Sequence, residues 1–468
     1  MIKFGTSGFR GILADNFNKE NVERVAYALL QVMDASGNKK PVYIGYDNRF
    51  MGVEFAKYIA CVLASKTKVY IYSQSVPSPL ISQATASGGY GVMITASHNP
   101  FNYNGVKIFL PHCMECGDDF AHAIEKISNS VKYEKIEKVD ISDKNIRWTS
   151  DISKYCNSIL NTIDAKAIKR SKLRVLVNTM HGSGNECMHA LLKACGVEYE
   201  IMNENVDPYF EHKLPAPYVY NIAEQAKRVK KEGFDVGIAL DGDADRFTLI
   251  DEQGEIYDCN YTACVLYNYY IKYKGKRGGI VVNNAFTTMA DKIATKYGFT
   301  CTRAKVGFKQ IAPVLQNTDA FIGAESNGIA YKDHIKSKDG VHTAMAIIDS
   351  IATTKMSFKE QLTALQKEYK FVSTLREYAY PITDKQKTFI IDTLINKKKY
   401  PKLLDYEIDS VYDSEGVKIT YTNGFWVMVR FSGNEPVVRI FTEMPNEKTC
   451  NIAFATFEKH LGLKERQK

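Results

Sequence analysis

The feature that most constrains this chain is a strand, helix and strand pattern that occurs three times. Each copy begins with a short apolar run that ends in Asp or Asn, at residues 41–47, 173–178 and 279–284. A helical stretch and a second strand follow, for example at 68–72 and 197–201. Alternation of short β-branched runs with helical patterns predicts βαβ units and a largely parallel sheet in each copy.

A polar loop follows the third strand of every copy, which we expect at residues 90–95, 234–240 and 319–322. The loops read Ala96-Ser-His-Asn-Pro100, Asp241-Gly-Asp-Ala-Asp-Arg246 and Gly323-Ala-Glu-Ser-Asn-Gly328. Ligands of open α/β sheets bind at the carboxyl ends of strands, so three equivalent loops are expected to converge on one cleft. Short apolar strands can also align by chance, and the repeat is therefore a hypothesis.

The last hundred residues have a different character. A hairpin is expected from strands at 425–431 and 437–441, which are joined by Ser432-Gly-Asn-Glu-Pro436. We therefore expect a smaller α+β domain after three similar mixed-sheet α/β/α domains, all around one central cleft. The expected boundaries are 1–147, 148–252, 253–368 and 369–468.

Composition limits the function classes. The 468 residues carry 61 Lys and Arg against 53 Asp and Glu, a net charge of +8, and 45% of them are apolar. This is ordinary for a globular core, and the scattered surplus favours a small anionic ligand over nucleic acid. The start has no apolar leader, and the ten cysteines are widely spread. We expect a cytoplasmic protein with reduced thiols and no membrane partner.

Asp241, Asp243 and Asp245 alternate along one short segment. A local kink could bring three hard oxygen ligands around one divalent cation. A calcium loop is the rival interpretation, but it requires Gly at the sixth position, where this chain has Arg246, and flanking helices rather than strands. A purely structural acidic turn is disfavoured because neighbouring carboxylates repel one another.

Thr95-Ala-Ser-His-Asn-Pro100 places a serine beside a histidine at a strand end. The Gly-x-Ser-x-Gly elbow of hydrolases is missing, which disfavours a catalytic triad. An ordinary turn bent by Asn99-Pro100 would explain the loop by itself. Its equivalence to the aspartate loop favours a function.

Two further loops could bind oxyanions. Gly5-Thr-Ser-Gly-Phe-Arg-Gly11 offers backbone amides and Arg10, although ordinary turns use the same residues. The segment Arg430–Pro436 adds a guanidinium, the Ser432 hydroxyl and the Asn434 side chain, which together suit a phosphate. A plain hairpin turn remains the alternative for this second loop.

These four motifs occur in the order seen in α-D-phosphohexomutases, which the chain resembles over nearly its whole length. The resemblance implies three related α/β domains and a fourth α+β domain around one cleft. It also implies an enzyme that moves a phosphoryl group between O1 and O6 of a hexose through a phosphoserine, with a hexose 1,6-bisphosphate as intermediate and activator.

The resemblance also implies a role for each matched residue. Ser97 would carry the phosphoryl group, and Mg²⁺ would be held by Asp241, Asp243, Asp245 and a phosphoserine oxygen. Lys107, in Asn104-Gly-Val-Lys107, would serve proton transfer, with His98 and Arg10 supporting the transferring group. Binding of the substrate is assigned to Arg246, Glu325, Ser326, Arg430, Ser432, Gly433, Asn434 and Arg439.

The sugar loop departs from the family pattern, because Ala324 stands where many members have Glu. Either Glu325 takes over through a shifted backbone or one hydroxyl contact is lost. His334-Ile-Lys-Ser-Lys-Asp-Gly340 is more similar to glucose-type mutases, which favours glucose and then mannose phosphates. A phosphoglucosamine mutase and a catalytically silent sugar-phosphate-binding homologue are the alternatives. We expect a monomer or homodimer whose partner is a phosphorylated hexose.

Overall fold

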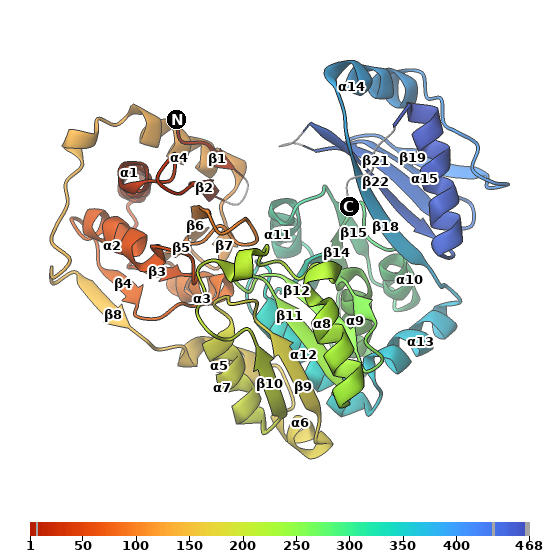
Figure 1. The fold of residues 1–468 in the computed structure, drawn as a ribbon, viewed down its shortest axis with the longest axis horizontal. Helices are drawn as coiled ribbons and strands as arrows, with labels where there is room; N and C mark the ends of the chain where they lie inside the picture. Colours follow the sequence, from red (N-terminus) through yellow and green to blue (C-terminus); the bar gives the residue numbers. More distant parts are fainter. Residues whose placement is uncertain (6–7, 433–435, 464–468) are drawn as a thin grey trace. The chain divides into compact units, whose positions relative to one another are not determined.

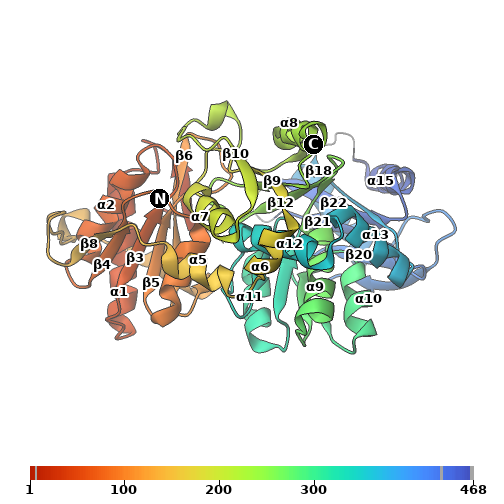
Figure 2. The same ribbon diagram turned by 90° about the horizontal axis from the view of Figure 1, so that it is seen from below.

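The computed structural model describes residues 1–5, 8–432 and 436–463. Its chain separates into two compact units, one of Met1–Val281 with Gly307–Leu362 and the other of Val282–Val306 with Thr363–Lys468. Four β-sheets organise the fold, and Figure 1 and Figure 2 show each sheet with its helices. None of the described helices is both long enough and apolar enough to cross a membrane.

The first sheet has eight strands, in the order β1-β2-β6-β5-β3-β4-β8, with β7 paired to β6. The strands are β1 (Phe4–Gly5), β2 (Gly8–Ile12), β3 (Val42–Tyr46), β4 (Val69–Tyr72), β5 (Tyr90–Ile94), β6 (Tyr103–Leu110), β7 (Met114–Glu115) and β8 (Ile146–Thr149). Helices α1 (Lys19–Ala35), α2 (Gly52–Leu63) and α4 (Asp118–Ser130) pack together, and α3 (Ser78–Ala84) packs on β3 and β5. Parallel and antiparallel pairs share this sheet, so it is mixed.

The second sheet has the order β10-β9-β11-β12-β13. Its strands are β9 (Arg174–Asn178), β10 (Glu198–Met202), β11 (Val236–Leu240), β12 (Phe247–Asp251) and β13 (Ile256–Tyr257). Its helices are α5 (Ser153–Leu160), α6 (Ala165–Ser171), α7 (Asn185–Cys195) and α8 (Val219–Glu232). The aspartate loop is the turn between β11 and β12, which pair antiparallel. The strands expected on either side of the three aspartates are thus confirmed.

The third sheet has the order β15-β14-β16-β17. Its strands are β14 (Ile280–Asn283), β15 (Cys301–Ala304), β16 (Ile322–Glu325) and β17 (Gly328–Tyr331). Its helices are α9 (Cys259–Lys274), α10 (Met289–Lys296), α11 (Phe308–Asn317), α12 (Gly340–Thr354) and α13 (Phe358–Tyr369).

One expected strand is misplaced in this sheet. The segment 319–322 was expected to be the third strand, but β16 begins at Ile322 and includes Gly323 and Ala324. A Cβ on Gly323 would lie 2.9 Å from a methyl group of Ile311, so α11 packs too closely for a side chain there. Small residues required by packing have low strand propensity, which explains the wrong prediction.

The fourth sheet is antiparallel throughout, in the order β18-β22-β21-β20-β19. Its strands are β18 (Thr374–Pro381), β19 (Ile408–Tyr412), β20 (Val417–Tyr421), β21 (Trp426–Phe431) and β22 (Val437–Met444), with helices α14 (Asp384–Ile391) and α15 (Glu447–Leu461). The expected hairpin is β21 paired with β22. The fold is therefore three mixed α/β domains followed by a C-terminal antiparallel-sheet domain, as predicted.

Candidate active site

The loops that follow β5, β11 and β16 meet inside the first compact unit. The Ser97 hydroxyl donates a 2.8 Å hydrogen bond to Asp241 Oδ2. Lys338 Nζ lies 3.3 Å from Glu325 Oε1 and 3.8 Å from Asp245 Oδ1. The repeat predicted this convergence, and these contacts confirm it for the three α/β domains.

Ser97 is held in an unusual backbone conformation. It is buried, and its φ of 53° lies in the left-handed region, which residues other than glycine seldom adopt. Its N–H donates to Thr95 Oγ1 over 2.7 Å, and the Thr95 hydroxyl donates to Asp47 Oδ2 over 2.5 Å. Such backbone geometry persists only where its surroundings impose it. The strand-end carboxylate of Asp47 is one part of those surroundings.

Arg49 is a second part of those surroundings, and no sequence motif marks it. Its side chain is fully buried, and Nε lies 3.3 Å from Asp47 Oδ2. The two terminal nitrogens donate to four main-chain carbonyls at 2.6–3.0 Å, those of Ser97, Asn99, Pro100 and Tyr103. Five donors in a planar fork suit this task, which a lysine could not perform. Arg49 therefore fixes the course of the whole serine loop.

The three aspartates form a compact cluster after β11. One ligand atom from each lies within 4.8 Å of the others, which makes Asp241, Asp243 and Asp245 a group able to hold a metal ion. Oδ1 of Asp243 and Oδ1 of Asp245 are buried and have no hydrogen-bond partner among the described residues. Buried carboxylate oxygens without partners are costly unless a cation binds them. The residues present therefore fit a hard divalent cation such as Mg²⁺.

Glycine at position 242 lets the aspartate loop approach the serine loop. A Cβ on Gly242 would lie 2.9 Å from the Ser97 carbonyl oxygen and 3.4 Å from Pro215. Any other residue would push the two loops apart. The Gly in Asp-Gly-Asp is therefore required by packing between two domains of the same compact unit.

Lys107, on β6, lies against the aspartate cluster. Its ammonium donates to Asp243 Oδ2 over 2.5 Å and to Asp245 Oδ2 over 2.9 Å. Burial acts to lower the pKa of Lys107, but the two carboxylates outweigh it and hold that pKa above its ordinary value. Lys107 is therefore protonated here, and it neutralises part of the cluster.

The aspartates differ in their electrostatic surroundings. Burial, and then repulsion from Asp243 and Asp245, raises the pKa of Asp241 to about 8. Burial also opposes ionisation of Asp245, but Lys107 and Lys338 outweigh it and lower its pKa. Neighbouring carboxylates that repel one another are expected to titrate apart in this way.

Three further expected residues surround the serine. The N–H of Arg246 donates to Asp241 Oδ1 over 3.0 Å, and its Nε lies 3.8 Å from Asp241 Oδ2. Arg10 Nη1 donates to Asn99 Oδ1 over 2.6 Å. His98 Nδ1 lies 3.4 Å from Ser97 Oγ. Burial and the nearby Arg246 and Arg10 lower the pKa of His98 to about 2, so its imidazole is neutral. Residues 6 and 7 of the loop before Arg10 lie outside the described residues.

In the sugar loop, the ladder between β16 and β17 is regular, with Ala324 opposite Ile329 and Glu325 opposite Gly328. The ladder has no bulge that would move Glu325 into the register position of Ala324. The buried Glu325 carboxylate instead pairs with Lys338, while Ser326 is exposed at the turn.

Lys338 belongs to the segment His334–Gly340, in which the sequence alone predicts no role for this lysine. The next residue, Asp339, is fully buried and caps α12 by accepting from the His342 N–H over 2.8 Å. It also accepts from the Tyr155 hydroxyl at 2.9 Å and pairs with His334 Nε2 at 2.8 Å. These contacts fix the backbone that presents Lys338, and the Lys-Asp-Gly sequence was the available signal.

The hairpin of the second unit brings two expected residues together. Arg430 on β21 lies directly opposite Arg439 on β22. Arg439 Nη1 pairs with Glu377 Oε1 at 2.6 Å, and the Ser432 N–H donates to the Val437 carbonyl over 3.0 Å. Like charges directly opposite one another are unfavourable in a sheet unless an anion is near. The predicted ligands Gly433 and Asn434 lie outside the described residues.

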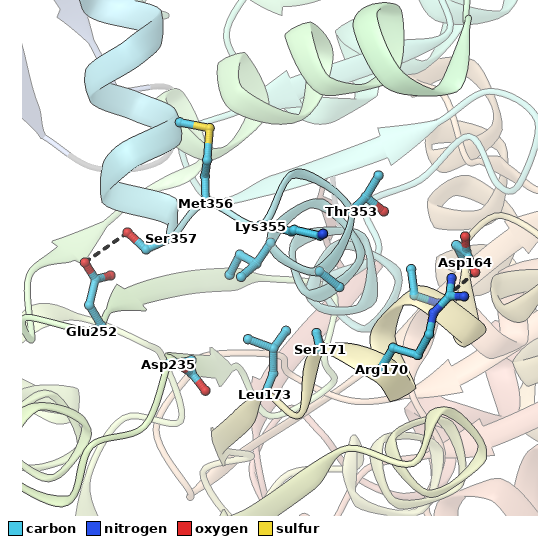
Figure 3. Close-up of a pocket in the computed structure, with 13 residues that line it drawn as sticks. Asp164, Arg170, Ser171, Leu173, Asp235, Glu252, Thr353, Lys355, Met356 and Ser357 are labelled. Atoms are coloured by element: carbon cyan, nitrogen blue, oxygen red, sulfur yellow. Dashed lines mark hydrogen bonds between the residues drawn. The ribbon is translucent and has the colours of Figure 1, made fainter.

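A cavity of about 880 Å³ lies elsewhere in the first unit, between the end of α12 and the segment around α6 (Figure 3). Figure 3 shows Arg170, Asp235 and Lys355 among its lining residues. It contains none of the expected site residues. Cavity size therefore does not locate the converging loops, whereas their side-chain contacts do.

Family models match most of the chain. Residues 1–135, 153–254 and 258–369 match the phosphoglucomutase/phosphomannomutase alpha/beta/alpha domains I, II and III. Residues 379–451 match the C-terminal domain of the same family. The matches follow one another in the family's order, and each of the four sheets has most of its strands within a matched range.

Individual relatives agree with these matches over the full length. A phosphoglucomutase/phosphomannomutase of Thermococcus kodakarensis is 31% identical over 454 residues, 95% of either chain. A phosphoglucosamine/phosphogalactosamine mutase of Sulfurisphaera tokodaii is 29% identical and covers 96% of each. The crystal structure of a protein of Thermus thermophilus, assigned as a phosphomannomutase, superposes with a TM-score of 0.86 at 26% identity, covering 98% of this chain and 99% of that one. The chain therefore belongs to the α-D-phosphohexomutase family of intramolecular phosphotransferases, to which phosphoglucomutases and phosphomannomutases belong.

Proposed function

We propose that this enzyme interconverts hexose 1-phosphates and hexose 6-phosphates, with glucose as its first substrate and mannose as its second. The observation that carries the proposal is the 2.8 Å contact between Ser97 Oγ and Asp241 Oδ2. It puts a buried hydroxyl beside a carboxylate cluster that fits a divalent cation, among Arg10, Lys107 and Arg246. Phosphoryl transfer depends chiefly on such positioning and charge neutralisation.

Ser97 is the proposed carrier of the phosphoryl group. In the forward step, the bond between phosphorus and Ser97 Oγ breaks while a bond forms to the free hydroxyl of the bound hexose phosphate. A hexose 1,6-bisphosphate results. After the sugar turns end for end, the other phosphoryl group returns to Ser97, and the same bisphosphate serves as activator by phosphorylating an unmodified Ser97.

One proton has to move in each step, from the attacking hydroxyl to the departing Ser97 oxygen. Lys107 is the proposed group for this transfer: its ammonium, which lies within the aspartate cluster, would give a proton to the departing Ser97 oxygen, and the resulting amine would take the proton of the attacking hydroxyl. Arg10 and neutral His98 are proposed to bind the transferring phosphoryl group. His98 can act as a hydrogen-bond partner but not as a cation, given its lowered pKa.

Mg²⁺ is the proposed cofactor, held by Asp241, Asp243, Asp245 and an oxygen of phosphorylated Ser97. When bound, it would neutralise negative charge on the phosphoryl oxygens. The buried Oδ1 atoms of Asp243 and Asp245, which accept no hydrogen bond from the described residues, support this assignment.

The non-reacting phosphate is proposed to bind at the β21–β22 hairpin. The directly opposite positions of Arg430 and Arg439 on the two strands support this assignment, with Ser432, Gly433 and Asn434 as further ligands. Arg246, Glu325 and Ser326 are proposed to contact the sugar and its reacting end. An anchor separate from the reaction centre would let the sugar bind in either direction.

Two observations bear on the sugar. The Thermococcus kodakarensis relative is a phosphoglucomutase/phosphomannomutase, which supports the preference stated above. The Sulfurisphaera tokodaii relative, at similar identity, acts on amino sugars by its name, which keeps a phosphoglucosamine mutase as the second candidate. A side-by-side assay of glucose, mannose and glucosamine 1-phosphates with catalytic bisphosphate tests the proposal. Turnover fastest with glucosamine 1-phosphate would favour the second candidate, and no turnover with any sugar would reject both.

A further inference from the structure

Glu115 is a carboxylate at the site that neither the family motifs nor the assigned roles include. It lies on β7, directly opposite Phe109 of β6. Residues two apart on a strand share a face, so Glu115 lies on the same side of the sheet as Lys107, at a diagonal position. Its side chain is partly exposed. The sheet therefore directs Glu115 toward the region that holds Lys107 and the aspartates.

Contacts on either side of Glu115 join β7 to the third domain. Lys336 Nζ donates to the His112 carbonyl over 3.0 Å, and Lys309 Nζ pairs with Asp118 Oδ1 at 2.7 Å. Helix α11 also packs against β7. These contacts hold Glu115 beside the segment that carries Lys338 and Glu325.

Electrostatics agrees with this placement. Loss of hydration at this partly buried position raises the pKa of Glu115 to about 7, against the opposing attraction of Lys338. Asp245, Lys107 and Glu325 are the other charged groups that influence it. Glu115 is thus within electrostatic range of charged side chains from all three loops' surroundings, namely Lys107, Asp245, Glu325 and Lys338.

The other carboxylates at this junction are engaged. Asp241 and Asp243 accept from hydroxyl groups or the lysine, Asp245 pairs with Lys107, and Glu325 pairs with Lys338. Among the described residues, the Glu115 carboxylate has neither a hydrogen bond nor an ion pair. A polar group in such surroundings gains from a partner that it lacks in the free protein.

A hexose offers several hydroxyl donors that need acceptors, and the methyl side chain of Ala324 supplies none. We propose that Glu115 is a specificity-determining residue that accepts a hydrogen bond from one ring hydroxyl of the bound hexose phosphate. This inference rests on the proposed function, because it assumes that the sugar binds where the three loops meet. It adds to that function a residue from the first domain that selects the sugar.

The test asks whether a substitution at Glu115 and the removal of one sugar hydroxyl abolish the same contact. Wild type, Glu115→Met and Glu115→Gln are assayed with glucose 1-phosphate and its 2-, 3- and 4-deoxy analogues. A hydrogen bond to a charged group is worth enough that wild type should lose about tenfold or more in kcat/KM with one of the three analogues. Glu115→Met should lose a similar factor with glucose 1-phosphate but show no further loss with that analogue. Glu115→Gln, whose amide oxygen can still accept a hydrogen bond, should have a kcat/KM with glucose 1-phosphate between those of wild type and Glu115→Met.

Asp119→Asn is the matched control, because Asp119 is an exposed carboxylate on the same segment. Asp119→Asn should have the same kcat/KM as wild type with glucose 1-phosphate and lose the same factor with each deoxy analogue. The inference would be overturned if Glu115→Met lost the same factor as wild type with each deoxy analogue. A purely structural role of Glu115 would lower kcat/KM for all four substrates alike. If Glu115→Met does not fold, the same comparison with Glu115→Gln decides. Wild type that turns over none of these sugars would instead reject the proposed function.

Discussion

The guanidinium of Arg49 donates to the main-chain carbonyl of Ser97 over 2.7 Å, which ties the strand end after β3 to the proposed phosphoryl carrier. The same side chain pairs with Asp47, whose carboxylate also accepts hydrogen bonds from the Thr95 hydroxyl and the Arg49 N–H. The left-handed conformation of Ser97 is therefore held at two main-chain atoms: its N–H donates to the Thr95 hydroxyl, and its carbonyl accepts from Arg49. The conformation of the serine loop thus depends on the buried side chains of Asp47 and Arg49, which lie outside the cluster of three aspartates.

Arg49→Lys should therefore lower kcat by about a hundredfold or more while changing KM little, because one ammonium cannot satisfy four carbonyls and misplaced reacting groups slow catalysis steeply. Steady-state kinetics measures the split between kcat and KM. Circular dichroism of the variant checks that it is folded. A kcat within twofold of wild type would show that Arg49 does not position Ser97.

Lys107→Met should bind Mg²⁺ more tightly than wild type, by about tenfold or more, because the ammonium that now neutralises Asp243 and Asp245 competes with the cation. Turnover should be lost at the same time. Isothermal titration calorimetry with Mg²⁺ alone gives the affinity without relying on activity. Lys309→Met is the matched control, since Lys309 pairs with the distant Asp118. Equal or weaker binding by Lys107→Met would contradict the competition.

Glu443→Gln should destabilise the C-terminal domain. The buried Glu443 carboxylate accepts five hydrogen bonds. Two come from Thr288, through its N–H and its hydroxyl. The others come from the side chains of Thr287 at 2.5 Å, Trp426 at 2.7 Å and Ser373 at 2.8 Å. In the variant, the amide nitrogen of Gln would point at groups that are themselves hydrogen-bond donors. We expect this to lower the free energy of unfolding by about 3 kcal/mol. In a Trp148→Phe background Trp426 is the remaining tryptophan, and its fluorescence reports urea unfolding. An unchanged midpoint would contradict this view of Glu443.

Lys418 should make the stability of the C-terminal domain depend on pH. Burial, and then repulsion from Arg303, lowers the pKa of Lys418 to about 7, well below the ordinary value near 10.5. Between these two values the unfolded chain binds more protons than the folded one, so stability should rise with pH from about 7 upward. Thermal unfolding from pH 7 to 9.5 measures this rise in wild type and in Lys418→Met. Parallel curves for the two proteins would show that Lys418 is not responsible.

Much of the fold was predictable because its signals are local. The strands before and after the three aspartates follow from apolar runs of ordinary length, and the equivalence of the loops follows from their place after each third strand. The exception was β16, where close packing of α11 demands glycine in a strand. Such a requirement depends on a helix that local sequence does not place.

The site was predictable where side chains make the contacts and hard to predict where the backbone does. The carboxylates and Ser97 stand in recognisable motifs. Arg49 acts on main-chain carbonyls, which leave no mark in the sequence of their own residues. Glu115 becomes visible only when the pairing of β7 with β6 is known. Both depend on contacts that the folded chain creates.

The most direct test of the central claim is the location of the transferred phosphoryl group. Protein incubated with Mg²⁺ and glucose 1,6-bisphosphate is digested, and its peptides are analysed by tandem mass spectrometry, with Ser97→Ala as control. The account predicts phosphate on Ser97 in wild type, removal of that phosphate by added hexose monophosphate, and neither phosphate nor turnover in Ser97→Ala. Phosphate on another residue, or appreciable turnover by Ser97→Ala, would contradict it.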